Sequence, residues 1–534
     1  MAKRRRERAA QSIRPRRLPD YWKQLAAVAA LAIAVYANSI PNGFVGDDKY
    51  QLLRNPLITD PALMPQVFTT GVWSFLKIPG NYYRPVQFLV YLLIYQFAGF
   101  QAPVFHFLMT LGHAVNTVLV YLLVRRLSPP KIAMAAAALF AVHPIHTEAV
   151  SWIACVPELL MTTLMLLGVW IFLRQDTNPR GGQIAGHCAI WLAALLTKET
   201  SVTLLPLYFA AGALFGGRGW SELRTNARLY AAMTGAFIVY LVLRVHALGA
   251  LAPGQHQFVR LGPAEFLLSA VAIAGGYMRM LVLPIDLNYF HVFHPTRSIT
   301  AVTAVSALAL GALAVAFFRL PWPSIRYCLF WIAVTMAPVF NLTGVGQNVV
   351  AERYLYLPSV GFCWIAGMAW NWLSARRAQM AAVLGIFVLL LCALQTISRN
   401  RDWRDTLTML QLTVRQSPDA ASMHDALASE YVERNAFDQA LVHQRLAVQY
   451  EPERSLFRFK LGHLLLLKDP GAAAAEFERA AALEPEASGP RCGLALAFEA
   501  TGRPEEAAEQ YRRVLRQDPQ NKDALEGLQR LQRK

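Results

Sequence analysis

The chain has 534 residues, of which 55% are apolar, and its formal net charge at pH 7 is +17. The mean hydropathy of +0.32 is too high for a soluble enzyme, and several segments hold the roughly 20 apolar residues that a membrane span needs. Nucleic-acid binding is disfavoured, because much of the positive charge lies directly before an apolar run. We therefore expect a polytopic membrane protein with a soluble C-terminal part.

The N-terminal tail, residues 1–23, carries nine Lys and Arg residues against Glu7 and Asp20. A basic tail directly before an apolar run is the positive-inside signature, and it predicts a cytoplasmic N-terminus. The run Leu25–Ala37 lacks a convincing small-residue cleavage site. We therefore interpret it as an uncleaved first span, not as a signal peptide.

The apolar runs after this span predict a bundle of eleven spans, with the C-terminus outside. A long outer loop is expected over 41–103, and its apolar piece 86–99 is short enough to be interfacial or re-entrant. Segment 266–283 is ambiguous. If it stays in the interface, the basic residues near 319–326 and 376–377 are cytoplasmic, so we prefer that arrangement. The remaining spans are expected at about 104–124, between Lys131 and His143, at 155–173, then one that ends at Thr197, one that ends at Arg218 and one that begins at about Leu229, followed by 299–318, 327–340, 360–373 and 380–397.

This topology collects polar residues at the outer face, whereas the cytoplasmic loops offer little beyond short basic linkers. The outward residues are Asp47, Asp48, Arg84, His143, His146, Glu148, Lys198, Glu199, Glu352 and Arg353. Charges in apolar surroundings are costly, so their gathering on one side indicates a functional site.

The segment after Arg401 is charged and rich in Ala, and its prolines recur at Pro418, Pro452, Pro485 and Pro519. This is the tetratricopeptide period, with two helices per repeat. We expect four parts: a tail over 1–23, a membrane domain over 24–399, a junction over 400–417, and three repeats with a polar capping helix over 418–534. The repeats offer either a concave surface for an extended polypeptide or a scaffold without a substrate role.

Two motifs have competing interpretations. Asp47-Asp48 is either a solvated pair of loop carboxylates or a source of a general base, which must reach within about 3 Å of the proton it removes. His143-Pro144-Ile145-His146-Thr147-Glu148 suits metal binding, pocket hydrogen bonds to a sugar or anion, or a plain interfacial cap. The chain has no Gly-rich phosphate loop, so a nucleotide-using cytoplasmic enzyme finds no support.

Several of these motifs resemble the transmembrane and tetratricopeptide-repeat O-mannosyltransferases. The resemblance covers nearly the whole chain in order. It is carried by Phe44-Val45-Gly46-Asp47-Asp48, Tyr83-Arg84-Pro85, the segment from Phe140 to Val150, Lys198-Glu199, the segment from Ala351 to Ser359, and Asn400-Arg401-Asp402-Trp403-Arg404-Asp405.

This resemblance implies an all-α, GT-C-like helical bundle followed by a tetratricopeptide α-solenoid. It also implies an inverting glycosyltransferase that uses a polyprenyl-phosphate sugar donor, with no metal and no other cofactor. An acidic residue of the first outer loop is the base in such enzymes, which corresponds to Asp48 or Asp47. We favour Asp48 slightly.

The resemblance leads to further expectations about the site and its partners. Arg84, Lys198 or Arg353 would hold the donor phosphate, and His143, His146, Glu148, Glu199 and Glu352 would shape the pocket. The partners are a polyprenyl-phosphate sugar, a protein or glycan acceptor, membrane lipid, and proteins that contact the repeats. No nucleic acid is expected.

Two features qualify these expectations. Only about three repeats follow the membrane part, fewer than in animal members of this family. The Ala- and Arg-rich composition suggests a bacterial inner membrane, with periplasmic repeats and undecaprenyl phosphate as the donor lipid. Mannose is inferred from the relatives alone. A non-enzymatic scaffold that recruits envelope proteins is the main alternative, and a transporter is disfavoured because most charges lie at span ends.

Overall fold

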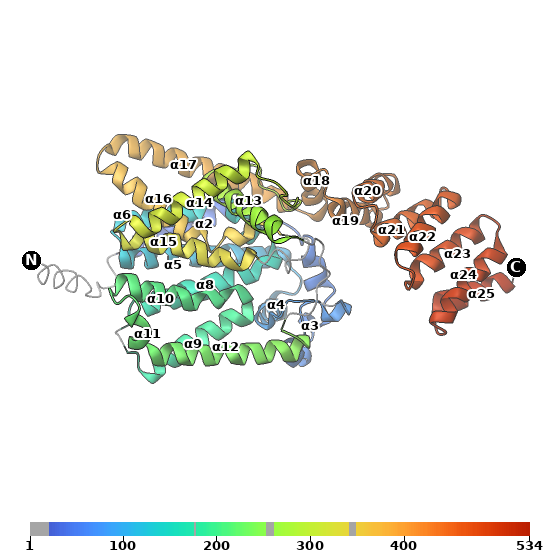
Figure 1. Ribbon diagram of the computed structural model, residues 1–534, viewed down its shortest axis with the longest axis horizontal. Helices are drawn as coiled ribbons and strands as arrows, with labels where there is room; N and C mark the ends of the chain where they lie inside the picture. The colour runs from blue at the N-terminus through green and yellow to red at the C-terminus, as the bar shows by residue number, and fades with distance from the viewer. Residues whose placement is uncertain (1–20, 79, 176–177, 252–260, 341–348, 534) are drawn as a thin grey trace, which may run out of the picture. The chain divides into compact units, whose positions relative to one another are not determined.

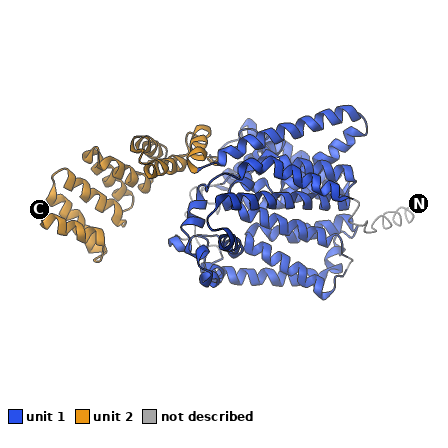
Figure 2. Cartoon of the chain, turned by 180° about the vertical axis from the view of Figure 1, so that it is seen from behind, with its two compact units in different colours: residues 1–287, 294–405 blue, residues 288–293, 406–534 orange. Residues whose placement is uncertain are grey.

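The computed structural model describes residues 21–78, 80–175, 178–251, 261–340 and 349–533, and within these ranges the regular structure is entirely helical. Most of the basic tail, up to residue 20, lies outside them. The chain divides into two compact units (Figure 2). The first comprises residues up to 287 together with 294–405, and the second comprises 288–293 together with 406–534.

The first unit is a bundle whose long helices run side by side in nearly one direction (Figure 1). Its α-helices are α2 (Trp22–Tyr36), α3 (Pro56–Thr59), α4 (Pro85–Ala98), α5 (Ala102–Leu127), α6 (Pro130–Val142), α7 (Thr147–Ser151), α8 (Val156–Phe172), α9 (Gly181–Thr197), α10 (Leu204–Phe215), α11 (Ser221–Thr225), α12 (Ala227–Leu248), α13 (Pro263–Val282), α14 (Ala301–Arg319), α15 (Pro323–Met336), α16 (Ser359–Ser374) and α17 (Ala378–Arg399). Short helical turns connect them, among them η3 (Lys49–Leu53), η6 (Pro144–His146), η7 (Ile153–Cys155), η8 (Glu199–Thr203), η9 (Ala337–Phe340), η10 (Glu352–Leu355) and η11 (Asn400–Trp403).

Among the described residues, seven helices are long and apolar enough to cross a membrane, or eight if the bent pair Pro130–Val142 and Pro144–Ser151 is one span. They contain α5, α8, α12, α13, α14, α15 and α17. Eleven spans were expected. The count differs for two reasons. Helix α13, which was not expected to cross, is counted. Four expected spans lie in the shorter helices α2, α9, α10 and α16, of 15, 17, 12 and 16 residues. At 1.5 Å per residue, such helices are shorter than a hydrocarbon core of about 30 Å.

Helix α13 covers the ambiguous segment, and it passes the length and composition test for a span. Two hydrogen bonds fix the helix to its neighbours. Near its C-terminus, the Leu281 carbonyl lies 3.0 Å from Nε2 of His143. Near its N-terminus, the Ser269 hydroxyl accepts a hydrogen bond from the Thr296 amide, just before α14 begins. That segment 266–283 stays in the interface remains a prediction.

The chain between α6 and α8 is broken into short turns at one end of the bundle. Helix α6 ends at Val142, and the two segments on either side of His143 are bent by 51°. Pro144 explains the break, because a proline disfavours the helical conformation of the residue before it and removes a backbone donor. His143 is accordingly extended, with φ −68° and ψ 125°. This break places the polar residues of η6 and α7 at the end of the bundle, where they are buried against neighbouring turns such as η10.

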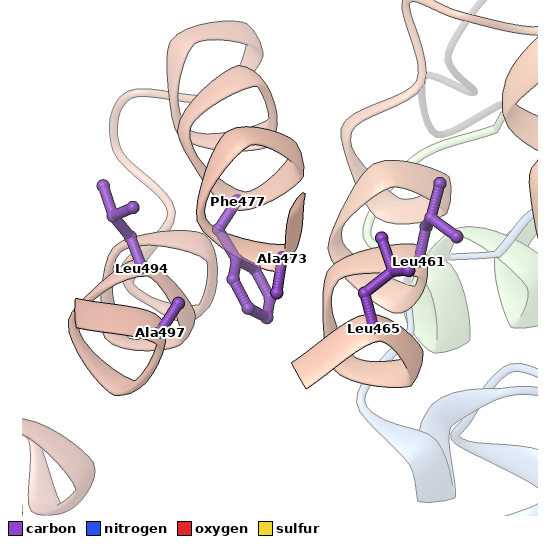
Figure 3. Close-up of a cluster of buried hydrophobic side chains, with 6 residues drawn as sticks. All are labelled: Leu461, Leu465, Ala473, Phe477, Leu494 and Ala497. Carbon is purple, nitrogen blue, oxygen red and sulfur yellow. The ribbon is translucent and has the colours of Figure 1, made fainter. Parts of the chain in front are cut away.

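The second unit confirms the predicted tetratricopeptide array. Its helices are α18 (Thr406–Gln416), the three pairs α19 (Ala421–Glu433) and α20 (Phe437–Tyr450), α21 (Ser455–Leu466) and α22 (Pro470–Leu483), α23 (Ser488–Ala500) and α24 (Pro504–Gln517), and the final helix α25 (Lys522–Gln532). Phe477 packs between neighbouring repeats, against Leu461 and Leu465 on one side and Leu494 and Ala497 on the other (Figure 3).

A short piece of the segment between α13 and α14, residues 288–293, belongs to the second unit. The Asn288 amide donates to the Phe290 carbonyl and to the Ser417 hydroxyl, each at 3.0 Å, and the Ser417 hydroxyl donates to the Phe290 carbonyl at 3.0 Å. The boundary between units along the chain falls at Asp405 and Thr406, inside the junction expected over 400–417. The sequence did not predict the loop contribution.

Candidate active site

Asp48 anchors the loop that follows the first helix. Its side chain is completely buried, and its two carboxylate oxygens accept hydrogen bonds from the backbone amides of Val45 at 2.9 Å and Ala154 at 2.7 Å. The Trp152 indole donates to the Val45 carbonyl at 3.1 Å, which fixes the same loop from the other side. Burial raises the pKa of Asp48 well above its usual range, although the two amides oppose this shift.

Asp47 has a different environment from its neighbour. It is half-buried, and within the described part of the chain its carboxylate has no hydrogen-bond partner. Burial raises the pKa of Asp47, while the positive charge of Arg353 acts in the opposite direction. A general base needs an accessible oxygen, and of the two carboxylates that of Asp47 is the more exposed. Which of the two is the base remains a prediction.

Lys198 and Arg353 come together around one buried carboxylate, that of Glu158. The Lys198 ammonium lies 2.6 Å from Oε1 of Glu158, and Nε of Arg353 lies 3.8 Å from the same oxygen. Arg353 also pairs with Glu148, which accepts its guanidinium and, at 2.7 Å, its backbone amide. The break after α6 and the turn η10 bring these two segments, about 200 residues apart in sequence, into contact.

Tyr354 lies between the two cations. Its ring centroid is 5.4 Å from the Lys198 ammonium and 5.0 Å from the Arg353 guanidinium, so both make cation–π contacts with one ring. A small polar cavity opens here, lined by Glu158, Thr162, Lys198, Thr200, Arg353 and Tyr354 among others. Lys198 and Arg353, both predicted as phosphate ligands, therefore line the same cavity.

Arg84 lies outside the lining of this cavity. Its guanidinium makes two hydrogen bonds to Glu199, at 2.9 and 3.4 Å, and lies 4.6 Å from the Tyr82 ring centroid. Burial would raise the pKa of Glu199, but Arg84 and then Lys198 outweigh it and lower that pKa to about 2. Arg84 and Glu199 thus form an ion pair next to Lys198, and the charge of Arg84 is already neutralised by Glu199.

His143 and His146 are packed in the interior, with both ring nitrogens of each residue used by the protein. His143 bonds the Leu281 carbonyl at 3.0 Å and accepts from the Ile145 amide at 3.2 Å. His146 bonds the Phe140 carbonyl at 2.9 Å and the Ser359 hydroxyl at 2.8 Å. No group of three or more His, Cys, Asp or Glu side chains suited to a metal ion occurs in the ranges that the structure describes.

Glu352 forms a separate ion pair at the same end of the bundle. It is completely buried, and its carboxylate lies 2.9 Å from the guanidinium of Arg399 at the end of α17. Arg399 also donates to the Leu287 carbonyl at 2.5 Å. This pair holds the last span against the loop that follows α13, so it supports the site instead of lining the polar cavity.

An apolar cavity of about 410 Å³ lies between α13, α14 and α15. It is lined by side chains such as Ala274, Met278, Leu310, Ala314, Met336 and Phe340. The helical segment of α15 and η9 carries residues of both cavities, because Met336 and Phe340 line the apolar one while Thr335 and Val339 line the polar one. The two cavities therefore lie on neighbouring faces of one helical segment.

Glu158 and Tyr354 are the residues that sequence reasoning missed. A signal for Glu158 was present, since a carboxylate in the first turn of an apolar helix is costly unless it is paired. Tyr354 stood next to Arg353, but only the folded chain shows that Lys198 reaches the same ring.

Family models match two parts of this chain. The model for dolichyl-phosphate-mannose-protein mannosyltransferase matches residues 84–245, and a tetratricopeptide repeat model matches residues 464–531. The first match contains α4 to α12 with the Lys198 and Glu158 pair, and the second contains the last repeats.

Curated relatives agree with both matches. Protein O-mannosyl-transferase TMTC3 of Mus musculus is 26% identical over 476 residues, covering 81% of this chain and 51% of the relative. Protein O-mannosyl-transferase Tmtc1 of Drosophila melanogaster is 25% identical over 538 residues, covering 82% of this chain and 62% of the relative. The chain spans about half the length of the first of these.

These findings confirm the resemblance to the transmembrane and tetratricopeptide-repeat O-mannosyltransferase family, and the protein is an integral membrane protein of the all-α class. Among solved structures, ArnT from Cupriavidus metallidurans bound to undecaprenyl phosphate is similar at 16% identity and a TM-score of 0.40, over 91% of this chain and 79% of that chain. The Archaeoglobus fulgidus oligosaccharyltransferase has 16% identity and a TM-score of 0.38, over 72% and 56% of the two chains.

Proposed function

We propose that the protein is a membrane glycosyltransferase that moves a sugar from a polyprenyl-phosphate donor to an acceptor hydroxyl. The observation that carries this proposal is the placement of an accessible carboxylate, Asp47, within electrostatic reach of Arg353, which lines a polar cavity together with Lys198. The similarity to protein O-mannosyl-transferases supports mannose as the sugar and a protein as the acceptor.

In the proposed reaction, Asp47 accepts the proton of the acceptor hydroxyl as its oxygen attacks the anomeric carbon of the donor sugar. The bond from that carbon to the phosphate oxygen breaks in the same displacement, so the configuration at the anomeric carbon inverts. Lys198 and Arg353 stabilise the negative charge of the departing polyprenyl phosphate. No metal is assigned a role.

Other residues at this end act on the shape of the site. Asp48 fixes the backbone that presents Asp47, and Glu148 orients Arg353. Arg84 and Glu199 flank Lys198, whereas His143, His146 and Glu352 hold the surrounding turns. In this proposal Arg84 positions Lys198 instead of contacting the phosphate.

The apolar cavity offers a place for the first isoprene units of the donor. It is lined almost entirely by carbon atoms. The polar cavity that would receive the phosphate lies on the neighbouring face of the same helical segment, α15 and η9. A ligand with an ionic head and a hydrocarbon tail matches the chemistry of these two linings. The polar cavity has a volume of only about 20 Å³, so side chains that line it must move to admit a phosphate. We propose undecaprenyl phosphate as the lipid, a bacterial inner membrane as the location, and a periplasmic face for Asp47 and the repeats.

The Asp47→Asn variant tests this proposal. We expect the rate of sugar transfer from polyprenyl-phosphate mannose to fall by about 10²–10⁴-fold, the usual contribution of a general base. The assay uses the full chain in detergent with labelled donor and membrane-protein acceptor. Asp60→Asn is the matched control, because Asp60 is an exposed carboxylate of the same loop that caps the turn at Ala62.

Full activity of Asp47→Asn would contradict the assignment of the base. If the unmodified protein neither binds nor turns over any polyprenyl-phosphate sugar, a scaffold that recruits envelope proteins through its repeats becomes the better explanation.

A further inference from the structure

The cations proposed to hold the donor phosphate are already neutralised in the structure. Lys198 pairs with Glu158 and Arg353 pairs with Glu148, while Arg84 pairs with Glu199. The side chains of Lys198 and Glu158 are only 6% and 5% exposed. A buried cation without a counterion is strongly unfavourable, so these carboxylates are required when no ligand is bound.

Glu158 occupies the position that a bridging phosphate would take. Its Oε1 lies 2.6 Å from the Lys198 ammonium and 3.8 Å from Nε of Arg353, and all three side chains line the polar cavity. A phosphate oxygen that reached both cations would meet this carboxylate. Glu148 does not compete in the same way, because it holds the backbone amide of Arg353 and does not line the cavity.

The same helix supplies a second position for the displaced carboxylate. Thr162 follows Glu158 by one helical turn on α8 and lines the same cavity. Its hydroxyl is buried and, among the described residues, has no hydrogen-bond partner. Residues four apart on a helix are neighbours, so a rotated Glu158 side chain can accept a hydrogen bond from this hydroxyl.

We infer that Glu158 is an internal counterion that occupies the donor-phosphate site, and that the phosphate group of the lipid displaces it from Lys198 and Arg353 toward Thr162. This inference rests on the proposed function and adds a residue that sets the affinity of the site. Because Glu158 competes with the ligand, its negative charge weakens phosphate binding while it stabilises the unliganded protein.

The Glu158→Gln variant separates these two effects, because it keeps the shape of the side chain and removes its charge. We expect a lower thermal midpoint than the unmodified protein without ligand, and at least about tenfold tighter binding of undecaprenyl phosphate, equivalent to about 1.4 kcal/mol. Inorganic phosphate should bind more tightly by a similar factor, whereas undecaprenol, which lacks the phosphate, should bind equally to both proteins.

Glu222→Gln is the matched control. Glu222 is also completely buried and paired with an arginine, Arg218, but it lines neither cavity. This variant should lose stability without any change in affinity for undecaprenyl phosphate. Thr162→Val should weaken undecaprenyl phosphate binding to the otherwise unmodified protein but not to the Glu158→Gln variant.

Equal or weaker binding of undecaprenyl phosphate by Glu158→Gln would overturn the inference. Binding that is absent in both proteins would overturn the phosphate site itself, and the inference with it. If Glu158→Gln binds more tightly and yet transfers no sugar, the counterion role is supported and the proposed reaction is not.

Discussion

Substitution of Gly493 by Ala should destabilise the packing between the second and third repeats of the C-terminal unit, because Phe477 leaves no room for a methyl group. A Cβ atom at Gly493 would lie 2.5 Å from a carbon of the Phe477 ring, and one at Gly462 would lie 2.7 Å from the same ring. Both glycines thus lie against the same edge of the ring, which packs among Leu461, Leu465, Leu494 and Ala497 (Figure 3).

The expected cost follows from two opposing effects. Overpacking a closed core costs about 1–3 kcal/mol, while replacing Gly by Ala inside a helix gains up to about 1 kcal/mol. We therefore expect Gly493→Ala to lower the free energy of opening by about 1–2 kcal/mol. Gly489→Ala is the control on the same helix, since its Cβ would make only an ordinary contact at 3.4 Å with Phe459.

Native-state hydrogen exchange, followed by mass spectrometry on the full chain in detergent, measures this quantity locally. Protection of α21 to α23 should fall in Gly493→Ala and stay equal or rise in Gly489→Ala. Combining Gly493→Ala with Phe477→Leu should reduce the cost of the glycine substitution, because the ring is gone. Undiminished protection in Gly493→Ala would refute the packing argument.

Three further predictions concern titration. Asp47 must be ionised to act as a base, and burial raises its pKa. As the pH is lowered, kcat/KM for sugar transfer should therefore begin to fall at a pH above about 3.9, the ordinary pKa of an aspartate. This decrease at low pH should be missing from the residual activity of Asp47→Asn. Glu199 has a pKa of about 2 beside Arg84, so its ionised form stabilises the fold. The difference in thermal midpoint between the unmodified protein and Glu199→Gln should persist above pH 5 and shrink as the pH falls below about 4.3 toward 2. Burial lowers the pKa of His424 and His443, whose Nδ1 atoms lie 3.0 Å apart. Hydrogen-exchange protection of α19 and α20 should therefore decrease as the pH falls below about 6.5. Protection that does not change between pH 7 and 5 would contradict this.

The repeat array and the membrane character followed from the sequence because both depend on local pattern. The recurrence of Pro418, Pro452, Pro485 and Pro519 marks a unit that packs only against its neighbours, so its period in sequence is also its period in space. Apolar runs likewise need no knowledge of the fold to be identified. The number of spans was less determined, because four of the expected spans lie in helices of 12 to 17 residues.

The gathering of Asp47, Lys198, Arg353 and Glu148 at one end was also predicted, because membrane topology assigns each loop to a side. The side of the membrane on which a loop lies does not, however, give the distances between its residues and those of other loops. The sequence treats Asp47 and Asp48 as equivalent neighbours, whereas the fold gives Asp48 two backbone amides and leaves the Asp47 carboxylate accessible.

Only the tertiary structure decided which charges meet. Arg84, Lys198 and Arg353 looked alike as candidate phosphate ligands, but packing pairs Arg84 with Glu199 and joins the other two through Glu158. These contacts link residues 40 to about 200 positions apart, and they depend on how α8, η8 and η10 pack. No period or local spacing encodes such distances, since they arise from the mutual burial of whole helices.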